Sequence, residues 1–200
     1  NGTLYRRGGD TVSRTDTDSG LVVYRGADGL IQEYGATDYN DLRLEDNVFS
    51  NGTAITVAGS LTLTTGSTTG ATLNQGAAFS ATNLTIDPTA VLDVGGSSLT
   101  VSGVYQNTGA LRLRGDDTLA LTMDTDSGVT LYYGGTGPYA TLSGGNTYFD
   151  LVLGGADTWN LGADLTVNGA LTLTAGTLQT GTWNMTLLGD LARVGGVLVS

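Results

Sequence analysis

The sequence predicts an all-β protein: a right-handed parallel β-helix, or β-solenoid, with about three short strands and 20 residues per turn, in roughly ten turns. Three observations predict this fold. Apolar residues recur at 20-residue intervals, short runs alternate apolar and polar residues, and the apolar spacing typical of an amphipathic helix is absent.

The 20-residue interval defines the expected core. In a solenoid, equivalent residues of successive turns stack, so each set with this spacing is expected to form one inward column. Phe79, Trp159 and Trp183 match no such column. The sets are Leu111, Leu131, Leu151, Leu171 and Leu191; then Leu113, Tyr133, Leu153 and Leu173; then Leu178 and Leu198.

Within a turn, alternating runs of three to five residues predict the strands. Near the carboxy terminus they begin at steps of 6 or 7 residues, and Gly, Asn or Asp separates them as turn residues do. Because crossovers between parallel strands are almost always right-handed, we expect a right-handed coil. The runs begin at Leu165, Leu171, Leu178, Met185, Leu191 and Val197.

A longer repeat lies above this one. Asp-Thr-Asp-Ser-Gly occurs at residues 16–20 and again at 124–128, and the segments 39–44 and 55–66 recur at 148–153 and 165–176. We interpret residues 1–200 as one solenoid domain with two long internal copies, about 3–109 and 110–200. The first copy is expected to carry one extra turn near 66–90, since a solenoid accepts a whole added turn.

The composition excludes several kinds of chemistry. The 200 residues contain no Cys, His or Lys, which excludes disulfides, Cys or His zinc sites, histidine acid–base catalysis and lysine Schiff bases. A net charge of −11 lacks the basic footprint that nucleic acids or anionic lipids require. Asp supplies 17 of the 19 acidic residues without following the 20-residue phase, so we interpret these residues as turn-forming and solubilising, and not as catalytic.

The duplicated Asp-Thr-Asp-Ser-Gly is the one candidate for a metal site. Carboxylates two residues apart and followed by Gly resemble the start of a calcium loop, with Asp16, Asp18, Asp124 and Asp126 as the candidate ligands. The competing interpretation is a turn in which the first Asp side chain accepts a hydrogen bond from the backbone. No other cofactor is expected.

Three further surface features have a functional and a structural interpretation. Asn1, Asn51, Asn83 and Asn184 match the N-glycosylation triplet, although a chain rich in Asn and Thr produces such matches by chance. The 33 Thr residues suggest ice binding only if they form a regular array, and Thr is also a good outward strand residue. The paired tyrosines could contact sugar or fill corners of the core; they are Tyr24, Tyr34 and Tyr39, and Tyr132, Tyr139 and Tyr148.

The segment 164–191 resembles the repeats of bacterial surface β-solenoids, as do segments 55–66 and 84–113. The families concerned are filamentous-haemagglutinin-like adhesins and autotransporter passenger domains. The resemblance is one of repeat texture. It implies a secreted or surface-displayed protein that acts in adhesion, biofilm or as a fibrous scaffold, and it implies no catalytic residue.

These observations favour a structural, non-enzymatic protein at an extracellular or cell-surface location. Neither end of the sequence shows a polar cap, so the expected partners are copies of the chain stacked head to tail into a fibre, or neighbouring repeats of a longer chain. A polysaccharide- or calcium-binding surface module is the second hypothesis. An ice-binding protein and a polysaccharide-degrading enzyme are weaker ones, and neither nucleic-acid binding nor membrane insertion is expected.

Overall fold

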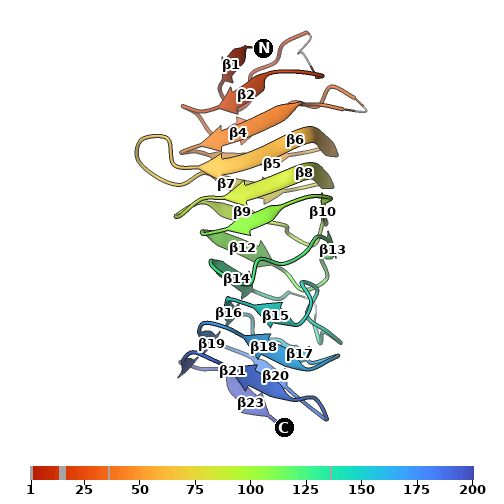
Figure 1. Ribbon diagram of the computed structural model, residues 1–200, viewed down its shortest axis with the longest axis vertical. Coiled ribbons are helices and arrows are strands. Elements are labelled where there is room, and N and C mark those ends of the chain that lie inside the picture. The colour runs from red at the N-terminus through yellow and green to blue at the C-terminus, as the bar shows by residue number, and fades with distance from the viewer. Residues whose placement is uncertain (1, 14–16, 36, 136) are drawn as a thin grey trace.

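The computed structural model describes residues 2–13, 17–35, 37–135 and 137–200. It is an elongated stack of short strands, with the amino terminus at one end and the carboxy terminus at the other (Figure 1). The described residues contain strands and no helix, and the parallel sheets stack about 20 residues apart in about 10 turns. The predicted β-solenoid is therefore confirmed.

Parallel pairing joins the strands into four sheets. The first contains β1 (Thr3–Arg6), β2 (Leu21–Tyr24), β4 (Asp41–Glu45), β6 (Ile55–Thr64), β8 (Phe79–Ile86), β10 (Ser98–Val101) and β13 (Thr118–Ala120), with β11 (Tyr105–Asn107) paired to β8. The second contains β3 (Gly29–Leu30), β5 (Val48–Asn51), β7 (Thr72–Gln75), β9 (Val91–Asp93), β12 (Ala110–Leu113), β14 (Val129–Tyr132), β16 (Asp150–Leu153), β19 (Leu171–Leu173) and β22 (Leu191–Arg193).

The two smaller sheets belong to the carboxy-terminal half. One contains β15 (Thr147–Tyr148), β18 (Leu165–Val167) and β21 (Met185–Leu187), and the other contains β17 (Thr158–Asn160), β20 (Thr177–Gln179) and β23 (Val197–Val199). Most strands are three to five residues long because Gly and Asp corners interrupt the alternating pattern. Most of these short strands turn one or two side chains into the core, whereas the longer β6 and β8 each turn four.

The register between strands confirms most of the predicted columns. Leu151 pairs with Leu171, which pairs with Leu191, and Leu153 pairs with Leu173. Leu178 pairs with Leu198 on the neighbouring face. Leu151, Leu153 and Leu171 have no exposed surface, so these stacked leucines form the interior of the rod.

The prediction is wrong for Leu131 and Tyr133. Thr130 pairs with Leu111 and with Leu151, so Thr130 occupies the inward position, and Leu131 lies on the outer side between Arg112 and Val152. For the same reason Tyr132, and not Tyr133, joins the column of Leu113 and Leu153. The turn that leads into β14 is one residue shorter than 20, and the turn that follows is one residue longer. Because a slip of one residue exchanges the inward and outward faces of a strand, Thr130 and Tyr132 point inward.

Two aromatic residues that matched no spacing do belong to columns. Phe79 pairs with both Ile55 and Leu99, and Trp159 pairs with Leu178; both aromatic side chains are fully buried. The turn from Ile55 to Phe79 contains the long loop between β6 and β7 and spans 24 residues, whereas Phe79 and Leu99 keep the 20-residue interval. Trp183, by contrast, is 43% exposed.

The described part of the first Asp-Thr-Asp-Ser-Gly segment, residues 17–20, and the whole second segment, residues 124–128, form the corners that precede β2 and β14. Their last residues, Gly20 and Gly128, have φ angles of 84° and 73°, a conformation that favours glycine. A Cβ at Gly128 would lie 2.3 Å from the carbonyl oxygen of Asn107 in the adjacent turn. The motif therefore has a structural role at both places in the repeat.

Candidate functional site

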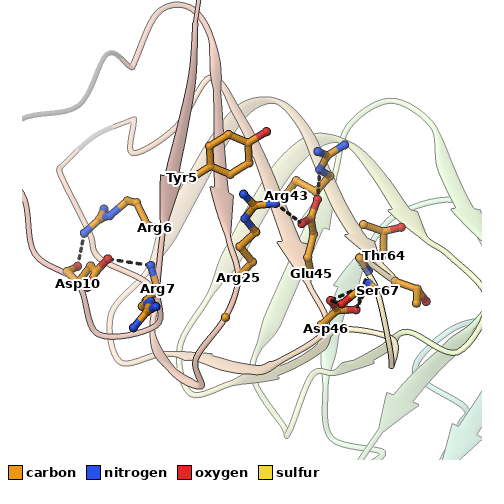
Figure 2. A pocket seen from close by; sticks show the side chains of 13 residues that line it. Tyr5, Arg6, Arg7, Asp10, Arg25, Arg43, Glu45, Asp46, Thr64 and Ser67 are labelled. Carbon is orange, nitrogen blue, oxygen red and sulfur yellow. Dashed lines mark hydrogen bonds and ion pairs between the residues drawn. The ribbon is translucent and has the colours of Figure 1, made fainter.

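A groove of about 700 Å³ lies along the outer side of the amino-terminal strands, where β1, β2, β4 and β6 end (Figure 2). Four of the eight arginines of the chain line it, in a protein whose net charge is −11. We call it the arginine groove; its lining residues are Tyr5, Arg6, Arg7, Asp10, Arg25, Gly26, Arg43, Glu45, Asp46, Thr64, Thr65, Gly66 and Ser67.

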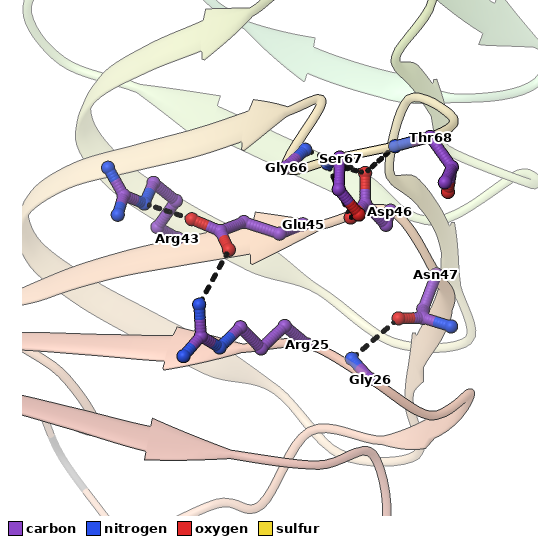
Figure 3. Close-up of polar contacts among 9 residues, drawn as sticks. All are labelled: Arg25, Gly26, Arg43, Glu45, Asp46, Asn47, Gly66, Ser67 and Thr68. Carbon is purple, nitrogen blue, oxygen red and sulfur yellow. Dashed lines mark hydrogen bonds and ion pairs between the residues drawn. The ribbon is translucent and has the colours of Figure 1, made fainter.

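Glu45 lies between two of these arginines. The Nε atom of Arg43 is 2.9 Å from one carboxylate oxygen, and a guanidinium nitrogen of Arg25 is 3.9 Å from the other (Figure 3). The guanidinium of Arg25 also lies over the ring of Tyr5, 4.0 Å from its centre. One carboxylate is thus shared by two cations, each of which keeps a partly exposed guanidinium.

Asp46 closes the other side of the groove and is occupied by the backbone. Its carboxylate accepts hydrogen bonds from the N–H groups of Gly66 and Ser67 at 2.6–2.9 Å, and from the Ser67 hydroxyl at 3.0 Å (Figure 3). The Ser67 N–H contributes most to a pKa of Asp46 below its ordinary value, because these bonds favour the charged carboxylate. Asp46 therefore holds the loop that forms one wall.

Arg6 is a buried cation, only 3% exposed, at an inward position of β1. Its guanidinium lies 4.9 Å from the centre of the Tyr24 ring, and it donates hydrogen bonds to Gln32 Oε1 at 2.7 Å, to the Tyr34 hydroxyl and to the Asp10 carbonyl oxygen. Among the described residues no carboxylate forms an ion pair with it, and its Nε has no hydrogen-bond partner.

Arg7 adds a second cation that has no carboxylate in an ion pair within the described ranges. The nearest acidic side chain in sequence, Asp10, accepts instead the backbone N–H of Arg7 at 2.8 Å. The groove therefore carries more positive charge than its own carboxylates neutralise. Chemically it can hold an anion.

The three calcium candidates that the structure describes, Asp18, Asp124 and Asp126, do not line this groove. Asp16 lies outside the described residues, and Asp18 lines a separate hollow with Asn40 and Asp41. Asp124 accepts hydrogen bonds from the N–H groups of Asn107 and Asp126, at 2.7 and 3.0 Å, as in the turn interpretation.

Across the part of the chain that the structure describes, no three acidic side chains are grouped to hold a metal ion. Calcium binding at these corners stays a prediction.

The glycosylation candidates differ in position. Asn1 lies outside the described residues, and Asn51 is 1% exposed, with its side-chain amide donating to the carbonyl oxygens of Thr53 and Ala77. Asn83 is half-buried and accepts a hydrogen bond from Val104. Asn184 is exposed and donates to Asp164, so it is the most accessible of the three described residues.

Most of the paired tyrosines lie in the core and not on a sugar-binding surface. Tyr24, Tyr39, Tyr132 and Tyr148 have no exposed surface, and Tyr139 stacks on Trp159 with ring centres 4.5 Å apart. The arginine groove was not predicted from the sequence because its lining residues come from four consecutive turns. The available signal is the equal spacing of Arg7, Arg25 and Arg43, each 18 residues from the next.

No protein-family model matches this chain, and no curated protein or solved structure matches it either. Within the described ranges there is also no helix with the length and hydrophobicity needed to cross a lipid bilayer. The function is therefore argued from the geometry of the molecule itself.

Proposed function

We propose that this chain is a structural, non-enzymatic component of an extracellular fibre or surface adhesin, in which its end turns pair with further solenoid turns. Those turns would come from a second copy stacked head to tail or from neighbouring repeats of a longer chain. The observation that carries the proposal is the apolar, unpaired state of the carboxy-terminal turn. The resemblance of the repeats to those of bacterial surface solenoids supports the extracellular location.

The carboxy-terminal turn contrasts with the turn above it. In the described strands, β21, β22 and β23 each pair on one side only. Leu191 is 43% exposed, whereas Leu171, one turn earlier in the same column, is fully buried. Other apolar side chains at this end are also exposed: Leu188, Val194, Val197 and Val199.

The amino-terminal end offers a matching edge. β1 is the first strand of its sheet and pairs only with β2, and Leu4 and Tyr5 are about half exposed. Unpaired backbone groups on such an edge are a template for another strand. A contact between one end and the opposite end of the next copy does not close on itself, so repetition produces a filament.

The test is the size of the assembly as a function of protein concentration, by sedimentation velocity and negative-stain microscopy. We expect rods that lengthen in multiples of the single solenoid. Leu191→Lys should suppress lengthening, because it places a charge at the end of an apolar column. Val104→Lys, at an exposed apolar position between β10 and β11 and away from both ends, is the matched control and should leave the rods unchanged. A monomer at millimolar concentration would contradict pairing between chains.

Calcium binding is a second candidate that the duplicated corner motif favours. Calcium that bound only the folded chain would raise the melting temperature with its concentration. Equal melting curves in excess calcium and in a chelator would reject it.

A further inference from the structure

We propose that the arginine groove is a binding site for an acidic oligosaccharide, with the carboxylates of uronic-acid units as the groups that its guanidinium ions hold. The groove includes Tyr5, Arg6 and Arg7 of the first turn and opens on the outer side of the strands, so ligand binding there requires no second copy of the chain.

The groove has more positive charge than its carboxylates neutralise. Of the three carboxylates in the groove, Glu45 is shared by Arg25 and Arg43, Asp46 is bound by backbone N–H groups, and Asp10 accepts from the backbone of Arg7. Among the described residues neither Arg6 nor Arg7 has a carboxylate partner, and Arg6 is buried with its terminal nitrogens bonded to Gln32, Tyr34 and the Asp10 carbonyl oxygen. Arg7 is exposed, so a ligand that supplies negative charge would compensate it directly.

The arginines of the groove are suited to a carboxylate ligand. Glu45 shows that the arginines of this groove hold a carboxylate, with 2.9 Å between Arg43 Nε and its oxygen. The side chains of Arg25 and Arg43 are 53% and 37% exposed, so both keep donors that face solvent. A guanidinium presents five N–H donors in a planar fork that matches carboxylate oxygens.

The uncharged residues of the groove are suited to a sugar. Tyr5 offers a ring that is half exposed, and the hydroxyl-bearing residues Thr64, Thr65 and Ser67 line the opposite wall. Hydroxyl groups and an aromatic ring are the partners that sugar rings use, and a groove of about 700 Å³ is of the size that small-molecule sites have.

The charge of the protein disfavours a densely charged ligand. Double-stranded nucleic acid carries one charge per roughly 1.7 Å, and the protein as a whole repels it with a net charge of −11. Asp10 and Asp46 lie at the margins of the groove and oppose anionic groups there. An oligosaccharide that carries one carboxylate per sugar ring, with neutral hydroxyls between, suits the alternation of cations and carboxylates better.

The test uses the whole chain and four probes: tetragalacturonate, its carboxyl-reduced neutral counterpart, a heparin tetrasaccharide and a single-stranded oligonucleotide. Calorimetry measures affinity, and amide chemical shifts locate the site. We expect tetragalacturonate to bind and to perturb Tyr5, Arg25 and Ser67, with affinity that falls as salt rises. The neutral counterpart should not bind.

Two variants sharpen the result. Arg25→Gln should weaken binding about tenfold or more, because it removes a charge-assisted hydrogen bond. Arg112→Gln is the matched control: Arg112 also pairs with a carboxylate, Asp93, and lies over a tyrosine ring, Tyr133, but it lies outside the groove. Its affinity should be unchanged, and thermal melting confirms that both variants fold.

The outcomes separate clearly. Heparin carries uronic carboxylates as well as sulfates, so its binding alongside tetragalacturonate, with the same loss in Arg25→Gln, would support the site. Binding of heparin without binding of tetragalacturonate would overturn the assignment to carboxylates. Equal binding of the neutral probe, equal loss in both variants, preference for the oligonucleotide, or no binding at millimolar probe would each overturn the proposal. None of these results bears on the length of the rods, so failure here is distinct from failure of the proposed assembly.

Discussion

The two copies of the repeat contain the same pair of buried tyrosines. Tyr24 and Tyr39 meet edge to face with hydroxyl oxygens 3.0 Å apart, and Tyr132 and Tyr148 do so at 2.9 Å. The ring centres are 6.3 Å apart in both pairs.

A loop closes each pair in the same way. In the first copy the N–H of Gln32 donates to Tyr24, and the hydroxyl of Tyr39 donates to the carbonyl oxygen of Gln32. In the second, Gly144 donates to Tyr132, and Tyr148 donates to the carbonyl oxygen of Gly145.

The residue stacked on the first tyrosine differs between the copies. Arg6 pairs with Tyr24, whereas Leu113 pairs with Tyr132. Around Arg6 the neighbours are polar, since Gln32, the Tyr34 hydroxyl and a backbone carbonyl accept its hydrogen bonds. Around Tyr132 they are aromatic, with Trp159 at 5.3 Å between ring centres.

This difference shows that the column position itself does not demand an apolar residue. An arginine is tolerated in the first turn because loop groups satisfy its donors and its ring partners lie beside it. In the middle of the rod, the fully buried Leu92 and Tyr132 lie in the turns on either side of Leu113, and such a cation would have few polar partners.

The largest expected effect comes from placing an arginine at the equivalent inward position in the middle of the rod. Leu113→Arg should lower the free energy of unfolding by about 3–5 kcal/mol, the range for an uncompensated buried charge. Leu131→Arg, on the outer face of the next strand, is the control and should cost less than about 1 kcal/mol. Urea unfolding monitored by circular dichroism measures both. Similar losses in the two variants would contradict the assignment of faces.

A smaller effect is expected from each tyrosine pair. Tyr39→Phe and Tyr148→Phe each remove a hydroxyl and leave a buried carbonyl oxygen without its donor, which should cost about 1–2 kcal/mol. Because the geometry of the two pairs is the same, the two losses in unfolding free energy should agree. A loss in one copy alone would show that the pairs are not equivalent.

Arg6→Leu should lower the free energy of unfolding by about 1–2 kcal/mol. It leaves the Tyr34 hydroxyl and the Asp10 carbonyl oxygen without a donor, and the lost desolvation penalty of the cation offsets part of that cost. Thermal melting at pH 7 measures the change. A loss as large as that of Leu113→Arg would mean that Arg6 is essential to its turn, and the contrast between the copies would fail.

The smallest effect is a local pH dependence in the first copy. Backbone N–H groups of Ser67 and its neighbours hold the pKa of Asp46 below the ordinary 3.8, so its contribution is present above that pH and is lost as pH falls through the lower folded value. The amide signals of Ser67 and Thr68 should therefore shift with pH along a curve whose midpoint lies below pH 3.8. A midpoint above that value would contradict these hydrogen bonds.

The repeat in the sequence predicted the solenoid, the stacking of Leu151, Leu171 and Leu191, and the corner role of the Asp-Thr-Asp-Ser-Gly segments. It did not predict that Thr130 takes the inward position expected for Leu131. One turn is a residue short and the next a residue long, so the mean spacing is unchanged while the two faces of that one strand are exchanged. Nor did it predict the arginine groove, since Arg7, Arg25 and Arg43 come together only when three turns are stacked.

The central claim is that strand register, and not a constant 20-residue interval, decides which residues lie side by side. Engineered cysteine pairs test it without background, because the chain has no Cys. Leu131 pairs with Val152 on the outer face. Adjacent strands lie roughly 4.8 Å apart, within the range that a disulfide spans. Leu131→Cys with Val152→Cys should form a disulfide on mild oxidation, and Leu131→Cys with Leu151→Cys should not; the reverse result would contradict the account.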